Sequence, residues 1–374
     1  MMSSIPFLRP SLPVVDEYVN LLRSIDETHL YSNYGPLCSQ FESQVLASFF
    51  QNQGGFCTVT NATIGLMLAV RLAKRKGRYA IMPSFTFAAT PLAAQWAGLE
   101  PWFVDVDPHT WCMDLNSLTQ AISELGDEVA VVIPYATFGT GMALEPYAAL
   151  QARGIPVVID AAASFGTKVL EDSAQGHFGL GFPGYIVFSF HATKAFGIGE
   201  GGGVYSGDAE AVARLKRAGN FGFASDRASC EQGLNSKISE YAAALALATW
   251  QIYPEKIRKR QAIHKAYLDG LECSGLGGKG WQPQRTRGDV AFQFMPILCP
   301  PGQNRDQVVA RMAELSIECR TYFSPACHQQ HQFAACPHDG LVVTERLSRC
   351  ILSLPLWEDM PESTVSRVIE GLTG

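Results

Sequence analysis

The stretch SFHATKAFGIGEGGGVYSGD, residues 189–208, offers two incompatible interpretations, and the rest of the sequence can be understood by choosing between them. Gly197, Gly199 and Gly202 satisfy the spacing G-x-G-x-x-G of a dinucleotide-binding loop. Lys194 lies just upstream of them, and residues 189–196 hold no other charged side chain. The stretch is therefore either a nucleotide loop or a lysine site.

A dinucleotide-binding loop follows a strand directly and opens a helix, so that the pyrophosphate meets the helix N-terminus. Here Gly202 is followed by GVYSGD, a short β-branched and aromatic run that ends in a turn. In addition, no acidic residue closes a second strand about 20 residues further on. We therefore reject the dinucleotide loop. The glycines predict a turn with positive φ that passes close to a bulky neighbour and leads into a strand.

Short apolar runs alternate with helical patterns upstream and downstream of this stretch, which is typical of an α/β fold with a mostly parallel sheet between helices. The predicted strands are residues 79–83, 101–107, 129–135, 156–162 and 185–190. The predicted helices are residues 64–76, 88–98, 114–124, 144–153 and 209–218.

A long helical pattern at 236–271 predicts a connecting helix, which Pro254 should kink or break. We therefore expect an N-terminal arm and large domain over residues 1–245, followed by the connecting helix and a small α+β domain over residues 246–374. The small domain is predicted from a strand-like run at 290–298 and helical patterns near 304–314 and 361–372.

The composition, 47% apolar and 17% charged over 374 residues, is that of a chain with an ample core. A net charge of −6 with scattered basic residues argues against nucleic acid or a membrane surface as partner. The one basic cluster, RLAKRKGR at 71–78, is interpreted as the cationic end of a helix. The ten cysteines form no C-x-x-C pair, so we expect a reduced, cytoplasmic protein. No apolar run approaches the length of about 20 residues that spans a bilayer.

Lys194 follows a predicted buried strand and is surrounded by neutral and apolar residues. Desolvation lowers the pKa of an amine, and an uncharged amine can attack an aldehyde to form a Schiff base. Chemistry with pyridoxal 5′-phosphate (PLP) also needs a carboxylate for the pyridine nitrogen, a phosphate site and a flat group to hold the ring. A solvated loop lysine is the alternative interpretation, and candidates for these partners elsewhere in the sequence favour the lysine site over it.

The sequence offers a candidate for each partner. Asp160 ends a predicted strand and places a carboxylate at the C-terminal edge of the sheet, where α/β proteins bind ligands; capping of a following helix is the alternative. The N–H groups of Ala62 and Thr63, with the Thr63 hydroxyl, could bind a phosphate at a helix N-terminus, although simple N-capping would also suit them. Ser189 could add a hydroxyl to that site, and Phe87 could stack on the cofactor ring.

A second cluster consists of residue types that bind zinc, namely Cys327, His328, His331, Cys336 and His338. Its spacings match no common zinc ribbon or finger. We therefore predict no metal, and metal analysis of the purified protein would test the alternative of a structural zinc.

Together the motifs resemble the DegT/DnrJ/EryC1/StrS family of sugar aminotransferases, which are PLP-dependent enzymes of fold type I. The resemblance covers nearly the whole chain. It is carried by NYGPLCSQFE (33–42), TNATIGL (60–66), PSFTFAATPLAAQWAG (83–98), FVDVDPHTWCMD (103–114), VVIDAAASFGT (157–167), SFHATKAFGIGEGG (189–202), GLNSKISEYAAALAL (233–247) and ILSLPLWEDM (351–360).

The resemblance implies a homodimer with shared active sites, because Asn235 would reach the phosphate of the cofactor in the neighbouring subunit. The sequence departs from the family pattern at one position. Ala163 stands where the family usually has His or Gln, which removes a hydrogen bond near the cofactor ring. The cofactor residues that the resemblance implies are Lys194 for the Schiff base and proton transfer, Asp160 for the pyridine N1, Phe87 for stacking, and Ala62, Thr63 and Ser189 for the phosphate.

The implied reaction transfers the amino group of L-glutamate to a keto sugar on a nucleoside diphosphate, a 4-keto-6-deoxyhexose or its 3-keto isomer. A keto sugar without a nucleotide and a non-catalytic sensor are the alternatives. Lys194 argues against the dehydratase branch of the family, in which His replaces the lysine. The sugar and diphosphate pocket is expected at Tyr31, Asn33, Tyr34, Arg320, Tyr322 and His328.

Overall fold

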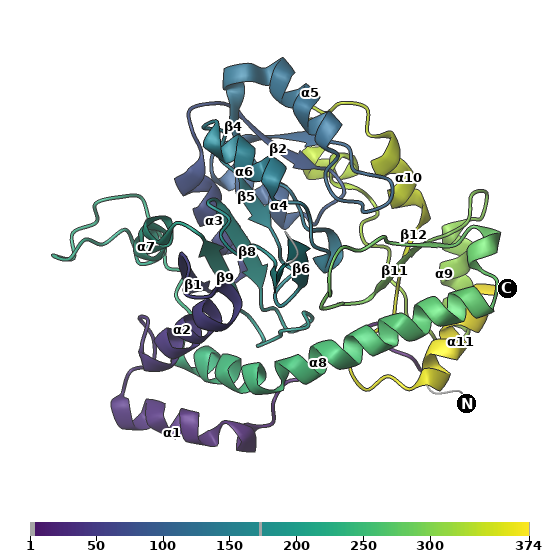
Figure 1. Ribbon diagram of the computed structural model, residues 1–374, viewed down its shortest axis with the longest axis horizontal. Helices are drawn as coiled ribbons and strands as arrows, with labels where there is room; N and C mark the ends of the chain where they lie inside the picture. Colours follow the sequence, from purple (N-terminus) through teal and green to yellow (C-terminus); the bar gives the residue numbers. More distant parts are fainter. Residues whose placement is uncertain (1–3, 172–173, 374) are drawn as a thin grey trace.

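A central sheet lies between two layers of helices in the computed structural model, which describes residues 4–171 and 174–373 (Figure 1). Hydrogen-bonded strands give the orders β3-β2-β4 and β1-β9-β8-β5, and bridges at Val132–Val157 and Tyr135–Asp160 link β4 to β5. Among the described strands of this sheet, β9 alone runs antiparallel to its neighbours, so the predicted mostly parallel sheet is confirmed. The strands are β1 (Gly55–Val59), β2 (Tyr79–Pro83), β3 (Glu100–Val104), β4 (Val129–Val132), β5 (Val158–Asp160), β8 (Tyr185–Ser189) and β9 (Gly202–Ser206).

Both faces of the sheet are buried, which explains why its strands are continuous apolar runs. Neighbouring strand residues alternate between two cores: Ile186 packs in the core on one face and Val187 in the core on the other. The helices over the Val187 face are α3 (Ala62–Ala73), α4 (Ala89–Trp96) and α7 (Ala209–Ala218). The helices over the Ile186 face are α1 (Val19–Thr28), α2 (Pro36–Phe50), α5 (Leu115–Leu125), α6 (Glu145–Ala152) and the first half of α8 (Glu240–Cys273).

Helix α8 connects the large sheet to the C-terminal part of the chain (Figure 1). It continues through Pro254, so a break there is wrong. Packing outweighs the one backbone hydrogen bond that proline removes, because both flanks of Pro254 are anchored. The Tyr253 hydroxyl donates to the Phe165 carbonyl, and Lys256 and Arg260 form ion pairs with buried Glu358.

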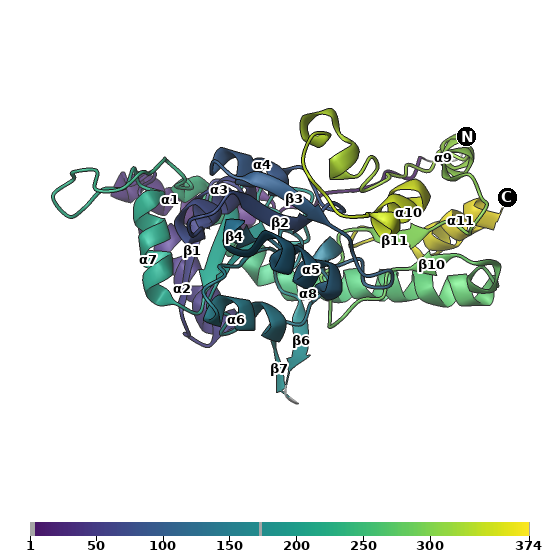
Figure 2. The same cartoon turned by 90° about the horizontal axis from the view of Figure 1, so that it is seen from above.

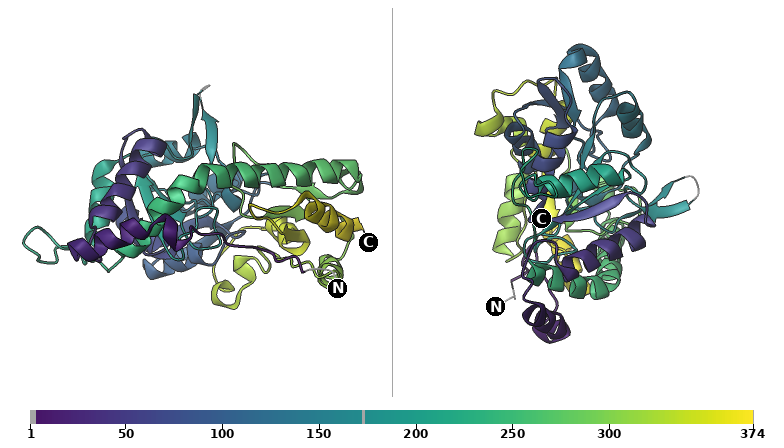
Figure 3. Two further views of the ribbon diagram at one scale, coloured as in Figure 1. Left: turned by 90° about the horizontal axis from the view of Figure 1, so that it is seen from below. Right: turned by 90° about the vertical axis from the view of Figure 1, so that its left-hand side faces the viewer.

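The C-terminal part has a small sheet of order β10-β11-β12 with its own apolar core. The N-terminal segment reaches this part, since Ile5 pairs with Ile317, and both ends of the chain lie on that side (Figure 3). The division at residue 245 stays a prediction. The elements are β10 (Gln282–Pro283), β11 (Met295–Leu298), β12 (Ile351–Leu354), α9 (Arg305–Glu314), α10 (Val342–Cys350) and α11 (Glu362–Thr373).

The sequence patterns did not predict every element. The hairpin of β6 (Lys168–Glu171) and β7 (Ala174–His177) projects from the large sheet (Figure 2), and α1, α2, β1, α10 and β12 were also missed. Only residues 295–298 of the strand-like run at 290–298 form a strand. Over the described residues, the search for a helix both long and apolar enough to cross a membrane finds none.

Candidate active site

The carboxyl ends of the parallel strands bring the predicted site residues to one edge of the sheet. β5 ends at Asp160 and β8 ends at Ser189, five residues before Lys194. β9 runs the other way and begins at this edge with Gly202, which pairs with both Ser189 and Val59. The end of β1 and the start of α3 therefore lie beside Ser189, at the edge where α/β proteins bind ligands.

The N-terminus of α3 is suited to a phosphate. The side chain of Asn61 caps the helix by accepting the Ile64 N–H at 2.9 Å. This leaves the N–H groups of Ala62 and Thr63 without a hydrogen-bond partner in the described part of the chain. A Cβ atom on Gly202 would lie 2.9 Å from the Ala62 nitrogen, so glycine allows this close approach. Free N–H groups at a helix start are the donors that phosphate sites use.

The loop after β8 fixes Lys194 at the same edge. Backbone hydrogen bonds close the loop from Phe190 to Gly201 at 2.9 Å and from Ala192 to Gly199 at 2.7 Å. Gly199 has φ +89°, which favours glycine, and β9 follows directly. The predicted turn with positive φ that leads into a strand is therefore confirmed.

The Lys194 amine lies in a poorly solvated place. Desolvation lowers the pKa of Lys194 to about 8, although the negative charge of Asp160 opposes the shift. The ammonium group therefore loses its proton more easily than an exposed lysine does. Its Nζ donates a hydrogen bond to Oε1 of Gln293 at 3.0 Å.

Asp160 is only 2% exposed. Burial raises the pKa of its carboxyl group, and the hydrogen bond from Thr90, the Ala162 N–H and the Lys194 charge oppose this. The Thr90 hydroxyl donates to Oδ2 at 2.7 Å, and the Ala162 N–H donates to Oδ1 at 3.1 Å. Residues 161–167 form turns, so the alternative of a cap for a following helix is wrong. The carboxylate is instead supported by neutral donors beside the lysine.

Three residues of this edge were not predicted from the sequence. Thr90 and Gln293 contact Asp160 and Lys194 as described, and Tyr135 is buried close enough to Asp160 for that charge to raise its pKa, second to desolvation. A signal existed for Gln293, because it is the one amide in the apolar run VAFQFMPIL. A buried polar side chain in such a run needs a partner.

The segment 319–328 approaches the edge from the C-terminal part of the chain. The Phe323 ring lies 6.3 Å from Phe87 and 6.0 Å from Tyr135. Phe87 is 59% exposed, so its ring is accessible for stacking on a ligand. Tyr322 packs against Phe323 at 5.9 Å, which brings one predicted substrate residue next to the site.

Two other predicted substrate residues in this segment have partners of their own. The Arg320 guanidinium lies over the Phe7 ring at 5.4 Å and pairs with Glu318 at 3.5 Å. Nδ1 of His328 lies 2.7 Å from Oγ of Ser84. Among the described residues, no group of three His, Cys, Asp or Glu side chains is placed to hold a metal ion.

Tyr31, Asn33 and Tyr34 lie in the loop between α1 and α2, and within the described chain they form no hydrogen bond or ring contact with Lys194 or Asp160. Tyr31 stacks on Tyr241, with ring centroids 6.3 Å apart, and is 46% exposed. The Tyr34 hydroxyl donates to the Lys216 carbonyl at 3.3 Å. Asn235 is exposed and forms a bridge with Asn220 at the base of a projecting segment between α7 and α8 (Figure 1).

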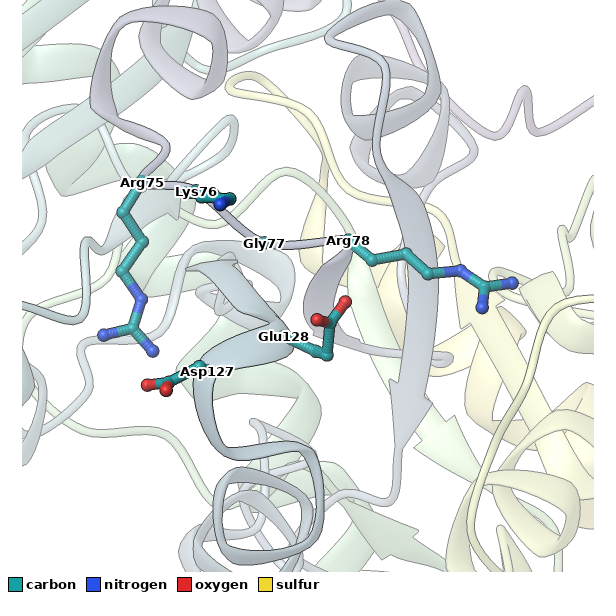
Figure 4. Close-up of a pocket in the computed structure, with 6 residues that line it drawn as sticks. All are labelled: Arg75, Lys76, Gly77, Arg78, Asp127 and Glu128. Atoms are coloured by element: carbon teal, nitrogen blue, oxygen red, sulfur yellow. The ribbon is translucent and has the colours of Figure 1, made fainter.

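A surface pocket of about 630 Å³ lies at the opposite ends of the strands (Figure 4). Its lining residues, 75–78 and 127–128, come directly before β2 and β4, whereas the site lies where the parallel strands end. The Arg75 guanidinium there donates to the carbonyls of Val129 and Gly126, and Arg78 pairs with Glu100 at 2.7 Å. Two of its three basic side chains, Arg75 and Arg78, are thus already engaged. The basic cluster lies mostly beyond α3, which ends at Ala73 rather than at residue 76.

Comparisons with known proteins find relatives that match over nearly the whole chain. A crystal structure from Bacillus cereus ATCC 10987, solved as a candidate PLP-dependent aminotransferase, is 48% identical with a TM-score of 0.96, and all of both chains is covered. The structure of DesI with its TDP-sugar product is 30% identical with a TM-score of 0.87, covering 100% of this chain and 93% of DesI. A dTDP-4-amino-4,6-dideoxy-D-glucose transaminase of Escherichia coli is 28% identical over 99% of this chain and 98% of its own.

The fold and this edge define a PLP-dependent transaminase of fold type I, and the groups available fit that cofactor. Lys194 offers an amine, Asp160 a carboxylate, and Ala62, Thr63 and Ser189 offer donors for a phosphate. The sequence profile of the DegT/DnrJ/EryC1/StrS aminotransferase family matches residues 14–373. The chain belongs to this family.

Thr90→Val should weaken PLP binding most strongly in acid. The variant loses the donor that favours the ionised carboxylate, so the pKa of Asp160 rises further and the group is protonated sooner as the pH falls. As the pH is lowered, PLP binding should weaken by up to about tenfold more in the variant than in the wild type, because a hydrogen bond to a charged group contributes about 1.5–3 kcal/mol. Titrating the cofactor-free protein with PLP at each pH measures this change in affinity. Thr90→Ser keeps the hydroxyl and should follow the wild type; equal pH dependence in all three proteins would refute the role of Thr90.

Proposed function

We propose that the protein transfers the amino group of L-glutamate to a keto-deoxy sugar carried on a nucleoside diphosphate, most simply a 4-keto-6-deoxyhexose, with the 3-keto isomer as the alternative position. The observation that carries the proposal is the desolvated Lys194 amine beside buried Asp160. The E. coli relative is a transaminase of a dTDP-linked dideoxy sugar, and the DesI structure contains a TDP-sugar product. The nucleotide-linked sugars of these two relatives support a nucleotide-linked substrate for this protein.

In this proposal each residue has a separate task. The N–H groups of Ala62 and Thr63, with Ser189, hold the cofactor phosphate, and Phe87 stacks on the ring. When bound, PLP supplies an aldehyde for the lysine and an electron sink for the carbon that loses its proton. Asp160 keeps the ring nitrogen protonated.

Lys194 has two roles. Its amine holds the cofactor, and its Nζ takes up the proton that leaves Cα of the amino donor. The lowered pKa suits this second role, because a general base works best when its pKa lies near the working pH. The methyl side chain of Ala163 offers no hydrogen bond, so the polar support of the two groups comes from Thr90, Gln293 and the Ala162 N–H.

We further propose a homodimer with shared active sites in the cytoplasm. Asn235 would complete the phosphate site of the partner, and Tyr31, Asn33 and Tyr34 would join Arg320, Tyr322 and His328 in the substrate pocket. The support is the projecting segment near Asn235 and exposed aromatic side chains such as Trp96, at 74%, which are frequent at interfaces. The ten free cysteines of the described chain support a reducing compartment.

Adding L-glutamate alone to the purified enzyme should release 2-oxoglutarate in an amount equal to the active sites, because the first half-reaction stops without an acceptor. Lys194→Ala should release none. A nucleotide-linked keto sugar should then accept the amino group at least about 100-fold faster than the same sugar without its nucleotide, since remote binding energy lowers the barrier. A fully active Lys194→Ala variant would sink the assignment, and wild-type protein that releases no 2-oxoglutarate would indicate a sensor.

Mixing two inactive variants should restore activity if the sites are shared. Lys194→Ala and Asn235→Ala subunits would form mixed dimers in which one site has both native residues and the other has neither. Turnover after mixing and reassembly should therefore rise well above that of either variant alone. Turnover equal to the average of the two separate variants would mean that Asn235 acts within its own chain or not at all.

A further inference from the structure

Gln293 links the C-terminal part of the chain to the catalytic lysine. Its side chain is 8% exposed and lies just before β11. Oε1 accepts the hydrogen bond from Lys194 Nζ at 3.0 Å, and Nε2 donates to Oγ1 of Thr193 at 3.3 Å. Both polar atoms of the amide thus have partners in the loop that holds the lysine.

The hydrogen-bond network determines which way this amide faces. The Thr193 N–H lies 3.3 Å from Nδ1 of His191, so that nitrogen is an acceptor. The Thr193 hydroxyl lies 2.8 Å from the same Nδ1 and therefore donates its only proton there. Oγ1 of Thr193 is left to accept from the NH₂ group of Gln293. The carbonyl oxygen of Gln293 must consequently face Lys194.

Buried charges hold the backbone of Gln293 in place. Nη1 of Arg260 donates to the carbonyls of Phe292 at 2.8 Å and Gln293 at 3.3 Å. Arg260 is 3% exposed and pairs with buried Glu358 at 2.9 Å. Moving Gln293 away from Lys194 would disturb these contacts, and a broken buried ion pair is costly.

We propose that Gln293 is a positioning residue, which holds the Lys194 amine at the sheet edge through a carbonyl oxygen of fixed orientation. The proposal rests on the catalytic role proposed above for Lys194. An ammonium group donates a stronger hydrogen bond than a neutral amine does, so this oxygen favours the charged form and moderates the effect of desolvation. Because an amide does not titrate, the acceptor stays the same whenever Lys194 gains or loses a proton.

The ionisation of Lys194 in the full-length, cofactor-free protein tests this directly. Acetic anhydride labels only the uncharged amine, and mass spectrometry of the peptide that contains Lys194 reports its labelling rate against pH. Gln293→Glu places a negative charge beside the amine, so labelling near pH 7 should be about tenfold slower than in the wild type. Gln293→Leu removes the acceptor, so labelling should be about threefold faster.

Gln284→Leu is the matched control. Gln284 is 6% exposed and uses its amide to donate to the carbonyls of Thr110 and Thr137, away from the lysine. This variant should lose thermal stability, as Gln293→Leu should, but with no change in Lys194 labelling. The result does not depend on which lysine binds PLP, so it can fail separately from the proposed function. Unchanged labelling in Gln293→Glu, which preserves side-chain size, or an equal change in the control would overturn the proposal.

Discussion

The site depends on one electrostatic constraint: an amine and a carboxylate, Lys194 and Asp160, share a poorly solvated edge of a buried sheet. Desolvation disfavours the charge on each group, and each charge partly stabilises the other. Neutral donors and acceptors provide the remaining support, through Thr90 for the carboxylate and Gln293 for the amine.

The topology of the sheet creates this constraint. Parallel strands end at a common edge, so β5 and β8 bring Asp160 and Lys194 together although 34 positions separate them along the chain. The antiparallel strand β9 starts at that edge, and Gly202 admits the N-terminus of α3 beside Ser189. One edge therefore offers an amine, a carboxylate and free N–H groups, which is the set of groups that PLP requires.

The sequence predicted strands β2 to β5, β8 and β9 and helices α3 to α7, because apolar runs bounded by polar turns leave few alternatives when both faces of a sheet are buried. It missed β1, α1 and α2. It predicted the wrong outcome at Pro254, where tertiary packing outweighs local propensity. Thr90 and Gln293 were missed because their partners lie 70 and 99 residues away along the chain. The amide in an apolar run indicates that Gln293 has a buried partner, but it does not indicate which one. Tyr31, Asn33 and Tyr34 form no hydrogen bond or ring contact with Lys194 within the described chain, so their role towards the substrate stays a prediction.

Reduction of the enzyme with borohydride tests the central claim most directly, because it fixes PLP covalently to the lysine that binds it. Proteolysis and mass spectrometry then locate the pyridoxyl group on a single peptide. The account predicts that the group is found on Lys194, in the loop between β8 and β9. A pyridoxyl group on another lysine, or none on the reduced holoenzyme, would contradict it.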